Sequence, residues 1–247
     1  MKRLNRQTVK EVKSYPERII QFGEGNFLRA FADWIIYQMN EKAGFNTCVV
    51  VVQHIPNGMI ETLNEQNGLY HLSLQGVDKG KITDNIELID VISRGLNPYS
   101  AFEEYMKLAE NPEIRFIISN TTEAGIAFDP ACRLDDRPAS SYPGKLTQLL
   151  YHRFKTFNGA TDKGWIIFPC ELIFHNGTEL KKCIYQYIEL WELEDDFKNW
   201  FETACGVYST LVDRIVPGYP KDSIGEIQDR TGIEDKLVVK AEIFHLW

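Results

Sequence analysis

Gly23-Glu24-Gly25-Asn26-Phe27-Leu28-Arg29-Ala30 decides the fold of this chain, because it joins an apolar run at residues 18–22 to a segment with helical spacing. A strand, a glycine turn and a helix in this order can hold a diphosphate. The first glycine permits the tight turn, the second lets the backbone approach the phosphates, and the amides that open the helix face the negative charge. The stretch therefore predicts a nucleotide-binding turn.

The fingerprint of this turn is incomplete. Leu28 stands where the third glycine of G-x-G-x-x-G would be. That glycine serves close packing of the helix on the strand, so we expect a wider separation between helix and strand here. The flanking strand and helix support the nucleotide interpretation more than the glycines alone do.

Composition limits the classes of partner. The 247 residues carry a net charge of −8, and no cluster of lysines and arginines is visible. This charge argues against nucleic acid and anionic membranes as partners, whereas a small anionic cofactor needs only local donors. No apolar run has the length of a membrane span, and none follows the basic N-terminus as in a signal peptide.

The cysteines and histidines suggest no metal or disulfide framework. The five cysteines are widely spaced without a C-x-x-C pair, and the five histidines form no H-x-x-x-H. Reduced thiols in a cytoplasmic protein are the simplest interpretation, and we expect no metal site.

The order of predicted elements gives the fold class. Short apolar runs predict strands at residues 18–22, 48–52, 115–119 and 164–169. Helical patterns cover residues 27–39 (closed by Gly44), 98–109, 142–154, 177–190 and 195–205. Alternating segments at 68–75 and 81–92, around a turn at 76–80, predict an inserted β-hairpin. This alternation predicts an α/β, Rossmann-like, doubly wound and mostly parallel sheet in one domain over residues 1–247.

Ligands of such sheets lie beyond the carboxyl ends of the strands, so the residues that follow each strand are the candidates. Gln53 follows the second strand, where an NAD site usually has an acidic residue. Its amide could bind a ribose hydroxyl, or it could simply end the strand in solvent. No arginine lies nearby in the sequence to bind a 2′-phosphate, so NADP gains no support either.

Two further loops carry polar side chains. Ser119, Asn120, Thr121 and Thr122 could bind sugar hydroxyls and phosphates, although such residues also make caps and turns. After the 164–169 strand, Glu171 and Asn176 could face the nicotinamide and substrate. The alternative for Asn176 is a turn with Gly177 that caps the next helix.

Two other polar positions have structural alternatives. Cys170 lacks an identifiable histidine partner, which favours a buried thiol over a nucleophile. Asp213 and Arg214 interrupt the apolar stretch at residues 211–217. They predict either a structural charge network or the orientation of a substrate or catalytic group.

Taken together, these segments resemble the mannitol dehydrogenase family of long-chain polyol and uronate oxidoreductases. Residues 23–30 are similar to its G-x-G-x-F-x-R-A signature, and residues 119–125, 170–177 and 212–217 follow in the family's order. The resemblance extends over essentially the whole chain. It implies a metal-free Rossmann domain that binds NAD, and reversible hydride transfer between NAD and a sugar acid, D-altronate to D-tagaturonate.

The resemblance also implies roles for single residues. Asp213 matches an acidic residue that supports the catalytic lysine. The implied cofactor-binding segment comprises Ile19, Ile20, Gln21, Phe22, Gly23, Glu24, Gly25, Asn26, Phe27, Leu28, Arg29 and Ala30. The alternatives are a fructuronate or polyol dehydrogenase, or a nucleotide-binding module without catalysis.

Two departures from the family pattern matter. Glu171-Leu172 stands where polyol members have Asp-Asn, and Leu172 cannot donate the hydrogen bond of that asparagine, which disfavours mannitol as substrate. The family's catalytic lysine lies in a K-x-x-x-x-N-x-x-H motif of a helical C-terminal domain, and this motif does not occur here. We therefore expect the cofactor-binding portion of the enzyme, inactive alone and able to associate through the surface that the helical domain would cover.

Overall fold

Strands and helices alternate along the chain, as the computed structural model of residues 1–9, 12–122 and 124–247 describes it. The strands are β1 (Lys2–Arg3), β2 (Glu17–Phe22), β3 (Cys48–Val52), β4 (Tyr70–Asp78), β5 (Lys81–Ile89), β6 (Ile92–Leu96), β7 (Phe116–Ser119), β8 (Ile166–Pro169), β9 (Gly206–Val207), β10 (Ile233–Glu234) and β11 (Val239–Glu242). The helices are α1 (Asn26–Ala30), α2 (Ala32–Ala43), α3 (Ile60–Glu65), α4 (Phe102–Met106), α5 (Tyr142–Thr156), α6 (Asn176–Leu190), α7 (Asp195–Ala204) and α8 (Ile224–Thr231), with short 3-10 helices η1 (Lys107–Glu110) and η2 (Thr161–Lys163).

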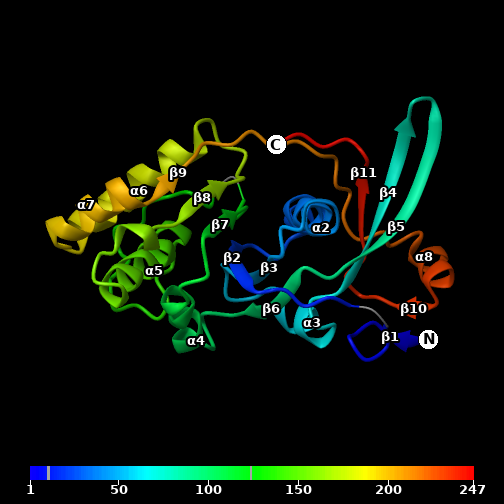
Figure 1. Cartoon of the computed structure of the whole chain (residues 1–247), viewed down its shortest axis with the longest axis horizontal. Coiled ribbons are helices and arrows are strands. Elements are labelled where there is room, and N and C mark those ends of the chain that lie inside the picture. The colour runs from blue at the N-terminus through cyan, green and yellow to red at the C-terminus, as the bar shows by residue number, and fades with distance from the viewer. Residues whose placement is uncertain (10–11, 123) are drawn as a thin grey trace.

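A six-stranded sheet in the order β6-β3-β2-β7-β8-β9 forms the centre of the molecule (Figure 1). All of its neighbouring strands run parallel. The chain begins in the middle at β2, moves outward through β3 to β6, and then returns to β7 on the other side of β2. This order is that of a doubly wound Rossmann sheet, which confirms the predicted fold class.

The two faces of the sheet bury two separate hydrophobic cores. Successive side chains of a strand point to opposite faces, so Ile20 and Val50 enter one core while Ile19 and Val49 enter the other. The first core is closed by α5, α6 and α7. The second is closed by α1, α2 and the strands of the hairpin. Burial on both faces explains why β3 is an uninterrupted apolar run.

The hairpin of β4 and β5 was predicted, but its surroundings were not. β4 runs to Asp78, so the turn is Lys79-Gly80 rather than the predicted 76–80. β4 also pairs in parallel with β11, which gives a second sheet in the order β11-β4-β5. Figure 1 shows the hairpin projecting beside α2, where Trp34 Nε1 donates to Glu87 Oε2 at 2.8 Å.

Other predicted elements also differ in detail. The helix predicted at residues 27–39 is broken at Phe31, which has φ −120° and ψ −80° and separates α1 from α2. Gly44 ends α2 in the left-handed region, as expected of a closing glycine. The segment predicted at 81–92 is two strands, since β6 begins at Ile92 and joins the central sheet beside β3.

Candidate functional site

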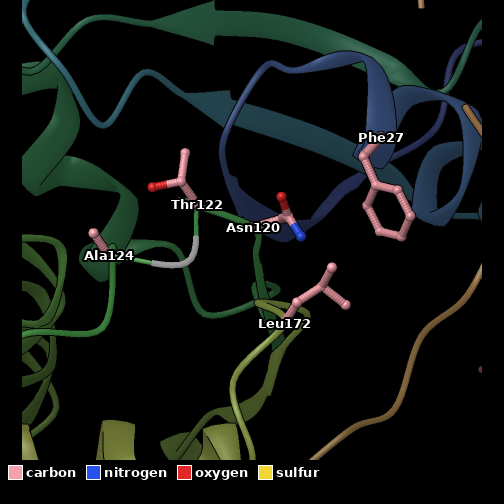
Figure 2. A pocket seen from close by; sticks show the side chains of 5 residues that line it. All are labelled: Phe27, Asn120, Thr122, Ala124 and Leu172. Atoms are coloured by element: carbon pink, nitrogen blue, oxygen red, sulfur yellow. The ribbon is translucent and has the colours of Figure 1, made fainter. Parts of the chain in front are cut away.

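The candidate site lies where the chain leaves β2 and β7 in opposite directions. These adjacent strands form the switch point of the sheet, the place where doubly wound folds bind ligands. A cavity of about 430 Å³ opens here, lined by Phe27, Asn120, Thr122, Ala124 and Leu172. Figure 2 shows these side chains arriving from α1, from the loop after β7 and from the loop after β8.

The glycine turn has the geometry that its sequence predicts. Gly23 has a φ of +116°, and a Cβ on it would lie 2.7 Å from the carbonyl oxygen of Asn120. A side chain is therefore excluded at this position. Gly25 precedes α1 without a side-chain cap, and a Cβ on it would meet no atom within 4 Å. No side chain caps the first amides of α1, which fits a diphosphate as their partner.

Arg29, the arginine of the signature, lies beneath the turn. Its side chain is 1% exposed. Nε donates to the carbonyl oxygen of Glu24 at 3.1 Å, Nη2 donates to Asn26 Oδ1 at 2.8 Å, and Nη1 donates to the carbonyl of Leu237. Burial lowers the pKa of this guanidinium, while nearby acidic groups oppose the shift. Arg29 holds the turn in place from below and ties it to the C-terminal part of the chain.

Much of the predicted cofactor segment is likewise interior. Besides Arg29, the buried members of the segment are Ile19, Ile20, Gln21, Phe22, Gly23, Glu24, Leu28 and Ala30. The apolar side chains among them support the turn from the interior, while the Phe27 ring lines the cavity.

The loop after β7 divides its residues between the cavity and the interior. Asn120 and Thr122 line the cavity, whereas Ser119 and Thr121 are buried. Thr122 has a φ of +80°, which is strained for a β-branched residue, and backbone strain of this kind often occurs at functional sites. Residue 123, which belongs to the same predicted stretch, lies outside the described residues.

Glu171 holds this loop rather than facing the cavity. Its carboxylate accepts hydrogen bonds from Ser119 Oγ at 3.0 Å, from the Thr121 amide at 3.0 Å and from Thr121 Oγ1 at 2.9 Å. Burial raises the pKa of Glu171, and these hydrogen bonds oppose the rise. The carboxylate thus links the loop after β7 to the loop after β8.

Asn176, the second predicted substrate-side residue, is fully buried. Its Nδ2 donates to the carbonyls of Pro169, Glu171 and Thr210, and its Oδ1 accepts from the amides of Gly177 and Thr210. Asn176 is the first residue of α6, whose N-cap is His175, so its side chain joins neighbouring loops and does not cap the helix as the structural alternative predicted. Neither Glu171 nor Asn176 is among the described residues that line the cavity. Leu172, between them, is 66% exposed and does line it.

Gln53 is not a strand end in solvent. It is buried, and its Nε2 donates to the carbonyls of Ile55 at 2.9 Å and Pro56 at 3.1 Å. Its Oε1 accepts weakly from the Ile60 amide at 3.4 Å. Beside it, beyond the ends of β3 and β6, lies a second cavity of about 370 Å³. The lining residues of this second cavity are Gln53, Pro56, Asn57, Gly58, Ile60, Glu61, Asn64, Gly95, Leu96, Asn97, Ser100 and Ala101.

Asp213 and Arg214 do not form the predicted charge network. Arg214 is buried, donates to the carbonyls of Glu242 and Ala30, and stacks 4.4 Å from the centre of the Trp34 ring. Burial lowers its pKa to about 10. Asp213 is exposed, and its backbone pairs with Leu246. Neighbouring residues of an extended segment point to opposite sides, which separates the two charges.

Cys170 is a buried structural thiol. Burial raises its pKa to about 12, so the thiolate needed for a nucleophile does not form near neutral pH. Within the described ranges, no three His, Cys, Asp or Glu side chains are grouped to hold a metal ion. None of the described helices is both long and apolar enough to cross a bilayer.

Comparison with known proteins gives three kinds of match. A family model for the mannitol dehydrogenase Rossmann domain matches residues 17–247. The altronate oxidoreductases of Phocaeicola vulgatus and Bacillus subtilis are 68% and 48% identical to the chain, and cover 100% of it with 51% and 52% of their own length. The chain thus spans about half the length of these relatives.

The solved structures show the same fold at low sequence identity. Mannitol 2-dehydrogenase of Pseudomonas fluorescens, in ternary complex with NAD and D-mannitol, has a TM-score of 0.81 at 21% identity. A D-sorbitol dehydrogenase in substrate-free form has a TM-score of 0.82 at 22% identity. Each match covers 99% of this chain and 54% of the solved chain. Because the family model matches nearly all of its length, the chain belongs to the mannitol dehydrogenase family.

Proposed function

We propose that residues 1–247 are the NAD-binding portion of an oxidoreductase that interconverts D-altronate and D-tagaturonate. The observation that carries the proposal is the cavity at the switch point, bordered by an uncapped glycine turn. The names of the relatives support the sugar-acid substrate, since altronate oxidoreductases match the whole chain at 48% to 68% identity. The NAD bound to the mannitol dehydrogenase of the same fold supports the choice of cofactor.

The turn and the neighbouring loop would hold the cofactor. The amides at the start of α1 would bind the diphosphate, because Gly25 offers them no competing side chain. Asn120 and Thr122 offer an amide and a hydroxyl to the remainder of the cofactor. NAD itself supplies the hydride chemistry when bound, and the protein supplies position and proton transfer.

Among the described residues that line the cavity, none carries an acid or a base. Phe27, Asn120, Thr122, Ala124 and Leu172 carry no titratable side chain. Oxidation of a hydroxyl needs a base within hydrogen-bond reach of its proton. The family's K-x-x-x-x-N-x-x-H motif does not occur in this sequence, and we propose that this base comes from the half of the longer relatives that this chain does not span. The supporting role of Asp213 stays a prediction, and its exposed side chain is free to meet that half.

A fluorescence titration of the purified chain with NADH tests the cofactor part of the proposal. We expect saturable binding, and no altronate-dependent NADH production by this chain alone. Measurable turnover would contradict the missing base, while absence of NADH binding would contradict the nucleotide site. Rates of the longer protein on tagaturonate, fructuronate and fructose would then separate the proposed substrate from its two rivals.

A further inference from the structure

Glu24, the residue between the two glycines of the turn, has a position that the diphosphate does not explain. Its side chain is 6% exposed, and its Oε2 has no hydrogen-bond partner among the described residues. Burial raises the pKa of this carboxyl, with the amides of Glu24 and Met59 and the charge of Arg29 opposing the rise. A buried carboxylate oxygen without a partner is costly, and it suggests that a partner arrives with a ligand.

The carboxylate lies directly behind two residues that line the second cavity, Gly58 and Gln53. A Cβ on Gly58 would fall 2.0 Å from Glu24 Oε1 and 2.5 Å from Gln53 Oε1. Glu24 therefore occupies the space that a side chain at position 58 would fill, and Gly58 lines that cavity. Gln53 is the position where an NAD site usually carries the acid that binds the adenosine ribose. Here an amide stands at that position, and the Glu24 carboxylate lies beside it, on the glycine turn that follows the neighbouring strand β2.

The charges around this cavity match an unphosphorylated ribose. Its described lining includes the carboxylate of Glu61 and neither lysine nor arginine. A 2′-phosphate would meet negative charge there without a compensating cation.

We propose that Glu24 accepts the hydroxyls of the adenosine ribose, and thereby selects NAD over NADP. This inference rests on the proposed function, because it assigns a specificity-determining residue to the same cofactor. It also gives the glutamate of the turn a role, since its side chain packs beside Gly58 and Gln53 and does not line the first cavity.

The test is a fluorescence titration of the chain with NADH and NADPH, repeated for Glu24→Gln. The unaltered chain should bind NADH more tightly than NADPH. Loss of a charge-assisted hydrogen bond should weaken NADH binding by about tenfold in the variant, with NADPH binding unchanged or stronger. Gly58→Ala, which alters no charge but adds a methyl group against the carboxylate, should also reduce the preference for NADH. The midpoint of thermal unfolding should show that both variants remain folded.

Two further substitutions make the result specific. Glu226→Gln makes the same chemical change on the exposed face of α8 and should leave both affinities as they were. Glu61→Gln removes the other carboxylate of the cavity. If it abolishes the preference for NADH while Glu24→Gln does not, Glu61 is the ribose acceptor and the inference is wrong. NADH binding that is equally tight in the unaltered chain and in Glu24→Gln also overturns it, with the proposed function intact. Absence of binding to either dinucleotide by the unaltered chain overturns both.

Discussion

Asp33 is the residue whose burial has the clearest consequence for stability. It is fully buried in α2, where Gln21 Nε2 and the Tyr70 hydroxyl approach its Oδ2 at 3.4 and 3.5 Å. Burial raises its pKa to about 7, and the hydrogen bonds and the charge of Arg29 only partly oppose this rise. The folded chain therefore binds this proton more tightly than the unfolded chain does.

The sign of the pH dependence follows. Below about pH 4 the carboxyl is neutral in both states and costs nothing. Between about pH 4 and 7 the unfolded state loses the proton first, so the free energy of unfolding falls as the pH rises, and the loss is complete above about pH 7.

Asp33→Asn keeps the side chain neutral at every pH. It should raise the free energy of unfolding by about 2–4 kcal/mol at about pH 8, and by little at about pH 4, in urea unfolding. If Asp33→Asn changes the free energy of unfolding by the same amount at both pH values, this account is contradicted.

At the scale of single residues, the candidate site could be predicted only in part. Asn120 and Thr122 were predicted and line the cavity, whereas Glu171 and Asn176 were predicted and are interior. A polar side chain in a loop has the same sequence pattern whether it faces a ligand or bridges two loops. Burial and hydrogen-bond partners decide between these roles, and both depend on the packed structure.

At the scale of the element, the two glycines of the turn should respond differently to the same substitution. Gly23→Ala adds a methyl group 2.7 Å from the Asn120 carbonyl at a positive φ, and should destabilise the chain by about 2 kcal/mol or more. Gly25→Ala adds it to open space, and should change the free energy of unfolding by less than about 0.5 kcal/mol. It should nevertheless weaken NADH binding, because the methyl group enters the cradle.

Denaturant unfolding and NADH titration of both variants measure this contrast. Each variant is the control of the other, since the change in composition is identical. A Gly25→Ala chain that binds NADH like the unaltered chain would contradict the diphosphate cradle.

Elements could be predicted from sequence where one local pattern determines them. β3 is a continuous apolar run because both of its faces are buried, and α5 begins at the predicted Tyr142-Pro143. β11 was not predicted, because its partner β4 lies far away along the chain. The break at Phe31 was missed because helical spacing continues through it, and the sequence offers neither proline nor glycine there.

At the scale of the whole molecule, one apolar face stands out. A cavity of about 590 Å³ is lined mainly by apolar residues, with Leu211 74% exposed. Its lining residues are Ile35, Met39, Phe168, Tyr208, Ser209, Thr210, Leu211, Leu246 and Trp247. Large exposed apolar surfaces of this kind usually contact another surface. We propose that, in a protein as long as the curated relatives, the half that this chain does not span would cover this face.

Light scattering tests whether the chain self-associates through this apolar face. The chain by itself should self-associate as its concentration rises, and Leu211→Lys should shift it toward the monomer. Val77→Lys, at an exposed apolar position on the hairpin, is the matched control and should not. If the unaltered chain stays monomeric at high concentration, the expected self-association through this face is wrong.

The order of synthesis gives the C-terminal strand an unexpected importance. Arg29 holds the glycine turn partly through the carbonyl of Leu237, and β4 gains a parallel neighbour only when β11 is present. While the ribosome is still producing residues 237–242, the turn near the N-terminus lacks one of its fixed supports. The glycine turn is thus made more than 200 residues before the carbonyl that helps to hold it, so a chain released shortly before residue 237 would carry the full glycine sequence without this support.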